Sequence, residues 1–74
     1  MAKPNVHVVP RNGQWGVLRE GSNRDSSHHQ TQADAIEAAR ATAQRERVEV
    51  LVHGRNGQIR ERNSYGSDPF PPRG

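Results

Sequence analysis

Hydrophobic and polar residues alternate along two stretches of the chain, and an Asn-Gly pair divides each stretch. The first covers residues 6–19 around Asn12-Gly13, and the second covers residues 48–62 around Asn56-Gly57. Alternation with a period of two predicts half-buried strands. Asn-Gly is typical of the two-residue type I′ turn, because both residues accept a positive φ. The pattern therefore predicts two β-hairpins with the same turn sequence.

A two-residue turn also fixes which side chains share a face of each hairpin. Counting back from the turns gathers one apolar set on a single face, which we expect to form the core. The opposite face mixes apolar and basic side chains, so it is neither plainly solvent-facing nor plainly core. The expected core set is Val6, Val8, Trp15, Val17, Val48, Val50, Val52 and Ile59, and the second face carries His7, Val9, Leu18, Glu49, Leu51, His53, Arg60 and Arg62.

A helix is predicted between the two hairpins, over roughly residues 32–46. Thr31 has the position and the hydroxyl of an N-cap, and Asp34 follows three residues later. Arg45 lies near the other end, where the helix dipole favours a cation. The apolar stripe is narrow and made of small side chains, which let a helix lie close to a sheet: Ile36, Ala39 and Ala43.

The predicted order of elements is β-β-α-β-β, which is an α+β fold. A right-handed crossover that brings the third strand beside the first gives a four-stranded antiparallel sheet of order 2-1-3-4, with the helix on one face. The valine-rich strands at 6–9 and 48–53 are then central, and the charge-bearing strands at 15–19 and 59–62 lie at the edges. Exchange of hairpins between two chains would satisfy the same pairings.

Residues 6–62 are predicted to form a single domain, which follows a flexible N-terminus at residues 1–5. The polar segment 20–30 is predicted to be a loop, long for so small a domain. Residues 63–74 are predicted to form a proline-rich C-terminal tail in an extended conformation. We expect this tail to dock on the domain, because Tyr65 and Phe70 supply apolar surface that the core lacks.

The composition leaves the core short of apolar mass. Only 30% of the 74 residues are hydrophobic, and there is no cysteine, which excludes disulfides and thiolate metal sites. For such a chain, apolar burial and chain entropy nearly cancel. We therefore expect a homodimer that covers the second face of the sheet. The expected partner-face residues are Val9, Leu18, Leu51, His53 and His7.

Charge raises a second hypothesis, which is weak nucleic-acid binding. The chain has eleven basic and eight acidic residues and a net charge of +3, and arginine on a sheet face and on hairpin tips suits phosphate contacts. The acidic residues are interspersed, however, and Trp15 faces the core and offers no surface for base stacking. The residues that this alternative would use are Arg11, Arg19, Arg55, Arg60 and Arg62.

The four histidines are the remaining candidates for chemistry. His28-His29 follows Asp25 and two serines, but consecutive side chains on an extended segment point apart, and neighbouring Ser and His do not make a triad. His7 and His53 fall on adjacent central strands and on one face. They suit an ordinary half-buried pair, a pH-sensitive pair or half of a zinc site across a dimer.

We accordingly predict no catalytic residue, no metal, no cofactor and no small-molecule substrate. The favoured function is a non-enzymatic homodimeric module for binding or structure. The apolar runs are too short for a membrane span, and the N-terminal residues lack the apolar segment of a signal peptide. We therefore expect a cytoplasmic protein without a membrane partner.

Five segments resemble known sequences. They are His7-Val8-Val9-Pro10, the Trp15 hairpin, residues 31–39, residues 52–60, and residues 64–72 with the motif Tyr-Gly-x-Asp-Pro-Phe-Pro-Pro. Together they resemble a small bacterial family, domain of unknown function 2188, from about residue 6 to residue 74. The tail motif is the most specific segment, with Ser67 where Asn is commonest. The family has no known activity, so the resemblance implies a natural bacterial domain and no particular chemistry.

Overall fold

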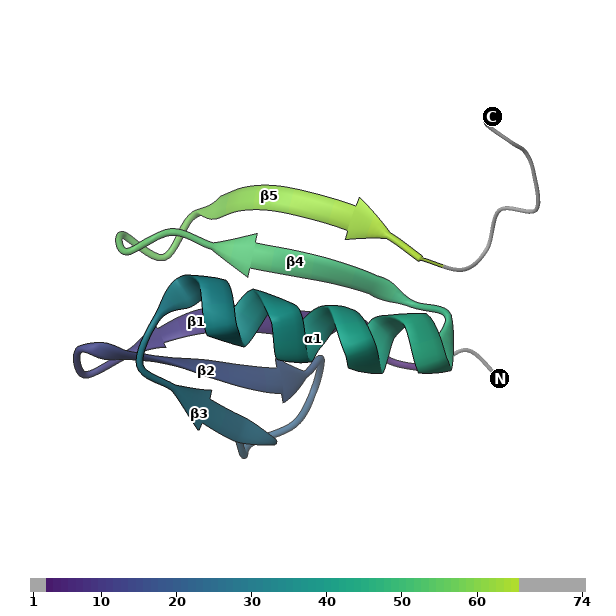
Figure 1. Ribbon diagram of the computed structural model, residues 1–74, viewed down its shortest axis with the longest axis horizontal. Coiled ribbons are helices and arrows are strands. Elements are labelled where there is room, and N and C mark those ends of the chain that lie inside the picture. The colour runs from purple at the N-terminus through teal and green to yellow at the C-terminus, as the bar shows by residue number, and fades with distance from the viewer. Residues whose placement is uncertain (1–2, 66–74) are drawn as a thin grey trace.

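The computed structural model describes residues 3–65 as a five-stranded sheet with one helix packed on it (Figure 1). The α+β class is confirmed, and so is the predicted order of four strands, which appear as β2-β1-β4-β5. Phe70 and the rest of the predicted tail beyond Tyr65 lie outside the described residues. The elements are β1 (Val6–Arg11), β2 (Gln14–Arg19), β3 (Ser27–His29), α1 (Gln32–Glu46), β4 (Glu49–His53) and β5 (Ile59–Ser64).

The predicted four-stranded, fully antiparallel sheet is wrong in two linked respects. A short strand, β3, adds to the edge of β2, and the central strands β1 and β4 run parallel. The second error follows from the first. A strand, a helix and the next strand make a unit whose strands are parallel, and here that unit starts from β3 rather than from β2. β4 runs in the same direction as β3. Since β3 and β1 are both antiparallel to β2, β4 is parallel to β1.

The segment predicted as a loop therefore contributes to the sheet, and β2 is an interior strand instead of an edge. Ser27 pairs with Val17, and His29 pairs with Trp15. Polar residues form this strand because the ladder uses only backbone groups. One chain completes its own sheet through the pairing of β1 with β4, so hairpin exchange has no support.

The two Asn-Gly turns differ. Asn12 and Gly13 both have positive φ, 46° and 83°, as the type I′ prediction requires. In the second hairpin only Gly57 does, with φ 88°. The Gly54 N–H there donates to Gln58 O at 2.7 Å, and the pairing shifts between Val52 and His53. The second turn is therefore a longer loop with a bulge.

The core lies between the sheet and α1. Its fully buried residues include Val6 and Val8 of β1, Val50 and Val52 of β4 and three alanines of the helix, and Ile36 and Tyr65 pack against it. One predicted core residue is misplaced: Ile59 is 53% exposed. The register shift next to Val52 pairs it with His53, on the face away from the core, and β5 also lies beyond α1, which covers the other strands (Figure 1).

The helix has the predicted bounds and the predicted cap. Thr31 is extended and its hydroxyl accepts the Asp34 N–H at 3.1 Å. Arg47 ends the helix in the left-handed region, with φ 60°. Within the described residues, no helix is long and apolar enough to cross a membrane.

Candidate binding face

The sheet face opposite α1 carries no helix within residues 3–65, and we call it the open face. Strand register brings its side chains into rows. One row runs Leu18, His7, Leu51 and Arg62, from β2 across β1 and β4 to β5. The neighbouring row includes His28, Gly16 and Val9. All five residues predicted for the partner face lie here, because each is one position out of phase with the valines of the core.

The open face is less apolar at its surface than the sequence indicated. Leu51 was expected to lack a cover, but it is only 5% exposed, flanked in its row by the longer His7 and Arg62 side chains. Val9 and Leu18 are half-buried. A shallow depression of about 270 Å³ opens between β1, β2 and the end of β4, lined by His7, Val9, Leu18, Arg19, Glu20, Gly21 and His53.

Two histidines meet beside this depression. His7 Nδ1 lies 2.8 Å from His53 Nε2, and the rings are 5.1 Å apart between centroids with a 31° tilt. The far nitrogen of each ring also has a neighbour. His53 Nδ1 lies 3.2 Å from the Gly57 carbonyl oxygen, and His7 Nε2 lies 3.5 Å from Glu20 Oε1. The predicted proximity of the two histidines is therefore confirmed.

A second polar cluster lies at the β3 side of the open face. Asp25 accepts two hydrogen bonds from Arg11, from Nε at 2.9 Å and from Nη2 at 3.0 Å. His28 Nε2 lies 2.7 Å from the same carboxylate, whose side chain is only 6% exposed. The Arg11 hydrogen bonds hold the pKa of Asp25 below its usual range, against the opposing effect of burial, and the charges of Arg11 and His28 add to this.

The strand β3 determines where the side chains of the two loop histidines lie. His28 and His29 occupy consecutive positions of a strand, so their side chains lie on opposite faces. His28 binds Asp25 on the open face, whereas His29 pairs with Trp15 and lies 2.9 Å from Ser27 Oγ through Nε2. Within residues 3–65, no group of three or more His, Cys, Asp or Glu side chains is placed to hold a metal ion.

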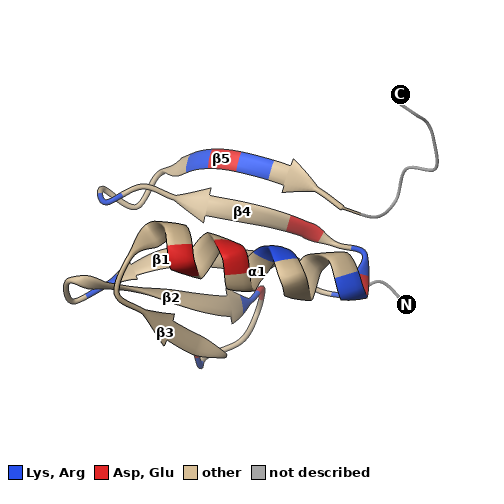
Figure 2. Cartoon of the chain, viewed as in Figure 1, with Lys and Arg blue, Asp and Glu red and all other residues tan. Residues whose placement is uncertain are grey.

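The arginines suggested for nucleic acid do not gather on one surface. Arg11 is bound to Asp25, Arg62 Nε lies 3.5 Å from Glu49, and Arg60 donates to Gln32 at the start of α1 at 2.8 Å. Acidic and basic positions interleave along β5 (Figure 2). Carboxylates thus already compensate part of the positive charge that would attract phosphate.

Arg19 lies at the end of β2 far from the Asn12-Gly13 turn. Its guanidinium forms an ion pair with Glu46 near the end of α1. This contact lowers the pKa of Glu46 and raises the pKa of Arg19, mainly through the hydrogen bond between them. Arg19 therefore joins sheet and helix.

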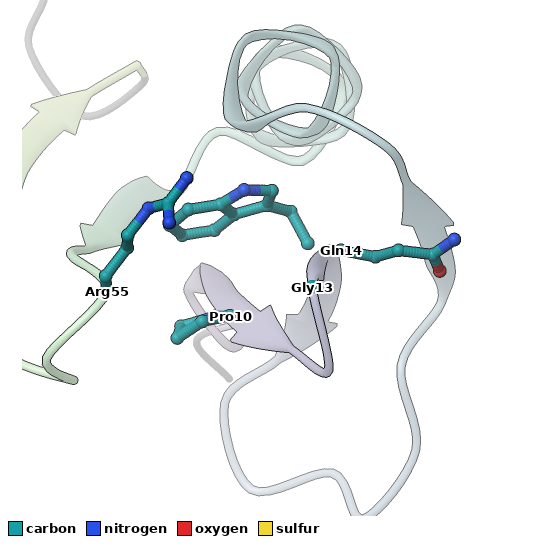
Figure 3. A pocket seen from close by; sticks show the side chains of 5 residues that line it. Pro10, Gly13, Gln14 and Arg55 are labelled. Carbon is teal, nitrogen blue, oxygen red and sulfur yellow. The ribbon is translucent and has the colours of Figure 1, made fainter.

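Arg55 lies at the turn between β4 and β5, beside a cavity of about 230 Å³ between the two hairpin turns. Pro10, Gly13, Gln14 and Trp15 complete the lining. Figure 3 shows Arg55 and Pro10 approaching from one side, while the Gln14 side chain points away. Because Trp15 is only 7% exposed, its ring cannot serve as a platform for a base.

Two acidic residues of these clusters, Glu20 and Asp25, were missed as site residues. Both belong to the segment between β2 and β3, which the sequence marked only as polar. Glu20 was within reach of sequence reasoning, because it directly follows the second strand of the predicted hairpin. In the structure the pairing extends to it, and its N–H donates to Asn5 O at 2.8 Å. Asp25 was not, because its position depends on how the segment folds back over Gly16.

Comparison with known sequences gives a clear relationship. Residues 6–65 match the family described as "Uncharacterized protein conserved in bacteria (DUF2188)". The chain belongs to this family. It is similar to the uncharacterized protein YdaT of Bacillus subtilis (strain 168), with 34% identity over 61 residues.

That match covers 82% of this chain but only 41% of YdaT, so the chain spans about two fifths of its relative's length. No solved structure matches. Neither the family description nor the name of the relative gives a function, as expected from the resemblance. For this DUF2188 domain, function must therefore be argued from the open face.

Proposed function

We propose that this DUF2188 domain is a non-enzymatic module that works as a homodimer and pairs through the open face. The observation that carries the proposal is the shallow depression beside His7 and His53, on the sheet face that α1 leaves uncovered. Half-buried Val9 and Leu18 border it. A second sheet packed here would bury these side chains at the usual spacing of about 10 Å between sheets.

Charge favours a second copy as the occupant. Arg62 lies at the β5 side of the open face, whereas Glu20 lies at the β2 side. A twofold axis parallel to the strands, placed between β1 and β4, exchanges β2 with β5. Arg62 of each copy then comes over the edge that carries Glu20 of the other. Such self-complementarity is what a twofold interface requires.

Charge-reversal variants test this arrangement without disturbing the core, because Arg62 and Glu20 have exposed side chains. We expect Arg62→Glu to weaken the dimer several-fold, since it places like charges together. The double variant Glu20→Arg with Arg62→Glu restores opposite charges and recovers dimerisation. Molar mass by light scattering during size exclusion measures both effects.

A matched control lies on the exposed side of α1, where Ala41→Asp introduces a charge away from the open face. We expect it to leave the dimer unchanged, whereas Leu18→Asp on the open face gives a folded monomer. Equal effects of the two substitutions, or no effect of Arg62→Glu, would refute the open face as the interface.

The alternative function is weak nucleic-acid binding, supported by the exposed Arg55 and Arg60 near the second turn. Phosphate contacts are strongest at low salt, so retardation of a nucleic acid at about 50 mM salt is its test. Loss of retardation in Arg55→Ala would support it. No retardation in that salt removes it.

A further inference from the structure

The hydrogen bonds around His7 and His53 fix where the proton of His53 lies. A carbonyl oxygen only accepts, so the contact between His53 Nδ1 and Gly57 O means that Nδ1 carries the hydrogen. In the neutral ring, Nε2 then has a lone pair, and it points at His7 Nδ1, 2.8 Å away. His53 is thus held with the lone pair of Nε2 directed toward His7.

The hydrogen of His7 is placed in the same way, from the other side of the pair. Its Nε2 faces the Glu20 carboxylate at 3.5 Å, which accepts a hydrogen from the ring. With that hydrogen on Nε2, Nδ1 is the atom available to face His53. Each ring therefore has its outer nitrogen tied to an oxygen acceptor and its inner nitrogen turned toward the other ring.

This is the arrangement that surrounds histidines bound to metal ions. Metal-ligating histidines almost always donate their second N–H to a carboxylate or a backbone carbonyl, which fixes the tautomer and aims the lone pair. Here Glu20 supplies the carboxylate and Gly57 the carbonyl. Zinc–nitrogen bonds of about 2.0–2.1 Å in a tetrahedron place two ligand nitrogens about 3.3 Å apart. The observed 2.8 Å needs an opening of only about 0.5 Å to admit the ion.

We propose that His7 and His53 form half of a zinc site, which the same two histidines of a second copy complete. One chain supplies two ligands and no larger cluster within residues 3–65, whereas structural zinc sites take four. This inference rests on the proposed dimer. The axis between β1 and β4 that brings Arg62 over the edge carrying Glu20 also passes beside the histidine pair, and so brings the two pairs together.

The binding step balances in protons and charge. Zinc enters between the lone pairs of His7 Nδ1 and His53 Nε2, and any additional proton held between these two nitrogens is released to solvent. The hydrogens on His7 Nε2 and His53 Nδ1 remain on the rings, where they are donated to Glu20 and Gly57. The two copies of Glu20 carry two negative charges, which compensate the dication.

The test uses the full chain without a histidine tag, stripped with a chelator and titrated with zinc chloride by calorimetry. We expect one zinc per two chains. His7→Ala and His53→Ala should each lose at least tenfold in affinity, and Glu20→Gln about tenfold, as for other groups that hold a zinc ligand in place. His28→Ala is the matched control, because His28 lies on the same face but binds Asp25.

Cobalt gives a readout on the unmutated chain, independent of whether variants fold. A tetrahedral site of four nitrogens gives intense visible absorption bands that saturate at half an equivalent of Co²⁺. Binding of one zinc per monomer, equal weakening by His28→Ala, or no binding would each overturn the zinc site. If the chain stays dimeric in chelator and then binds no zinc in the titration, the zinc site is overturned while the proposed dimer stands.

Discussion

The Asp25 carboxylate lies directly against the backbone of Gly16. A Cβ atom built on Gly16 would overlap Asp25 Oδ2 and come within 3.1 Å of Arg11 Cγ. Gly16 is the interior strand position at which the segment between β2 and β3 folds onto the sheet. The absence of a side chain there is what allows Arg11, Asp25 and His28 to join.

Gly16→Ala should destabilise the protein by about 1–2 kcal/mol, as overpacking of a close contact does. Urea denaturation measures the change. In an Asp25→Ala background the same substitution should be neutral or stabilising, because the obstacle is gone and alanine suits a strand better than glycine by about 0.5–1 kcal/mol. Additive effects in this cycle would contradict the contact.

Stability should fall in acid partly through Asp25. Its pKa is lower in the folded chain than the ordinary value near 3.9, so the unfolded chain takes up the proton first. The contribution is complete above about pH 5 and is lost as the pH falls through the folded pKa. Asp25→Asn should therefore lower the unfolding free energy near neutrality and have a shrinking effect below pH 4. A constant difference across this range would contradict the assignment.

Helix packing depends on small side chains facing the sheet. Ala35, Ala39 and Ala43 are fully buried, so there is no room for more atoms. Ala39→Leu should cost about 1–3 kcal/mol in unfolding free energy through overpacking. Ala41→Leu, at an exposed position of the same helix, should change it by no more than about 0.5 kcal/mol. Equal costs would show that the helix does not lie as close to the sheet as described.

The N-cap contact offers a simple local test. Thr31→Ala removes the acceptor for the Asp34 N–H and should cost about 1 kcal/mol in thermal or urea unfolding. Thr31→Ser keeps the hydroxyl and should cost much less. If serine and alanine behave alike, the hydroxyl does not cap the helix.

Sequence reasoning succeeded where one local rule decided the outcome. The Thr31 cap, the alanine stripe and the first Asn-Gly turn depend on neighbouring residues, and the strand period placed His7 and His53 together. It failed for β3, whose polar residues pair through backbone groups alone. That one strand determined whether the central pair is parallel, so a local omission became an error of topology.

The candidate site was predicted only in part, because local rules position some of its residues and not others. Its side chains on β1, β2 and β4 follow from alternation, and the paired histidines follow from the register. The contacts of Glu20 and Asp25 depend on the segment after β2. The Gly57 carbonyl reaches His53 because the second turn is longer than a type I′ turn, which the shared Asn-Gly sequence does not reveal.

Pairing of two copies of this DUF2188 domain through the open face would double the molar mass in solution. Sedimentation equilibrium of the unmutated chain, from about 1 to 100 μM, tests it most directly. We expect a mass twice that of the 8.3 kDa chain in the upper part of this range. A folded species of 8.3 kDa at every concentration, with and without zinc, would contradict it.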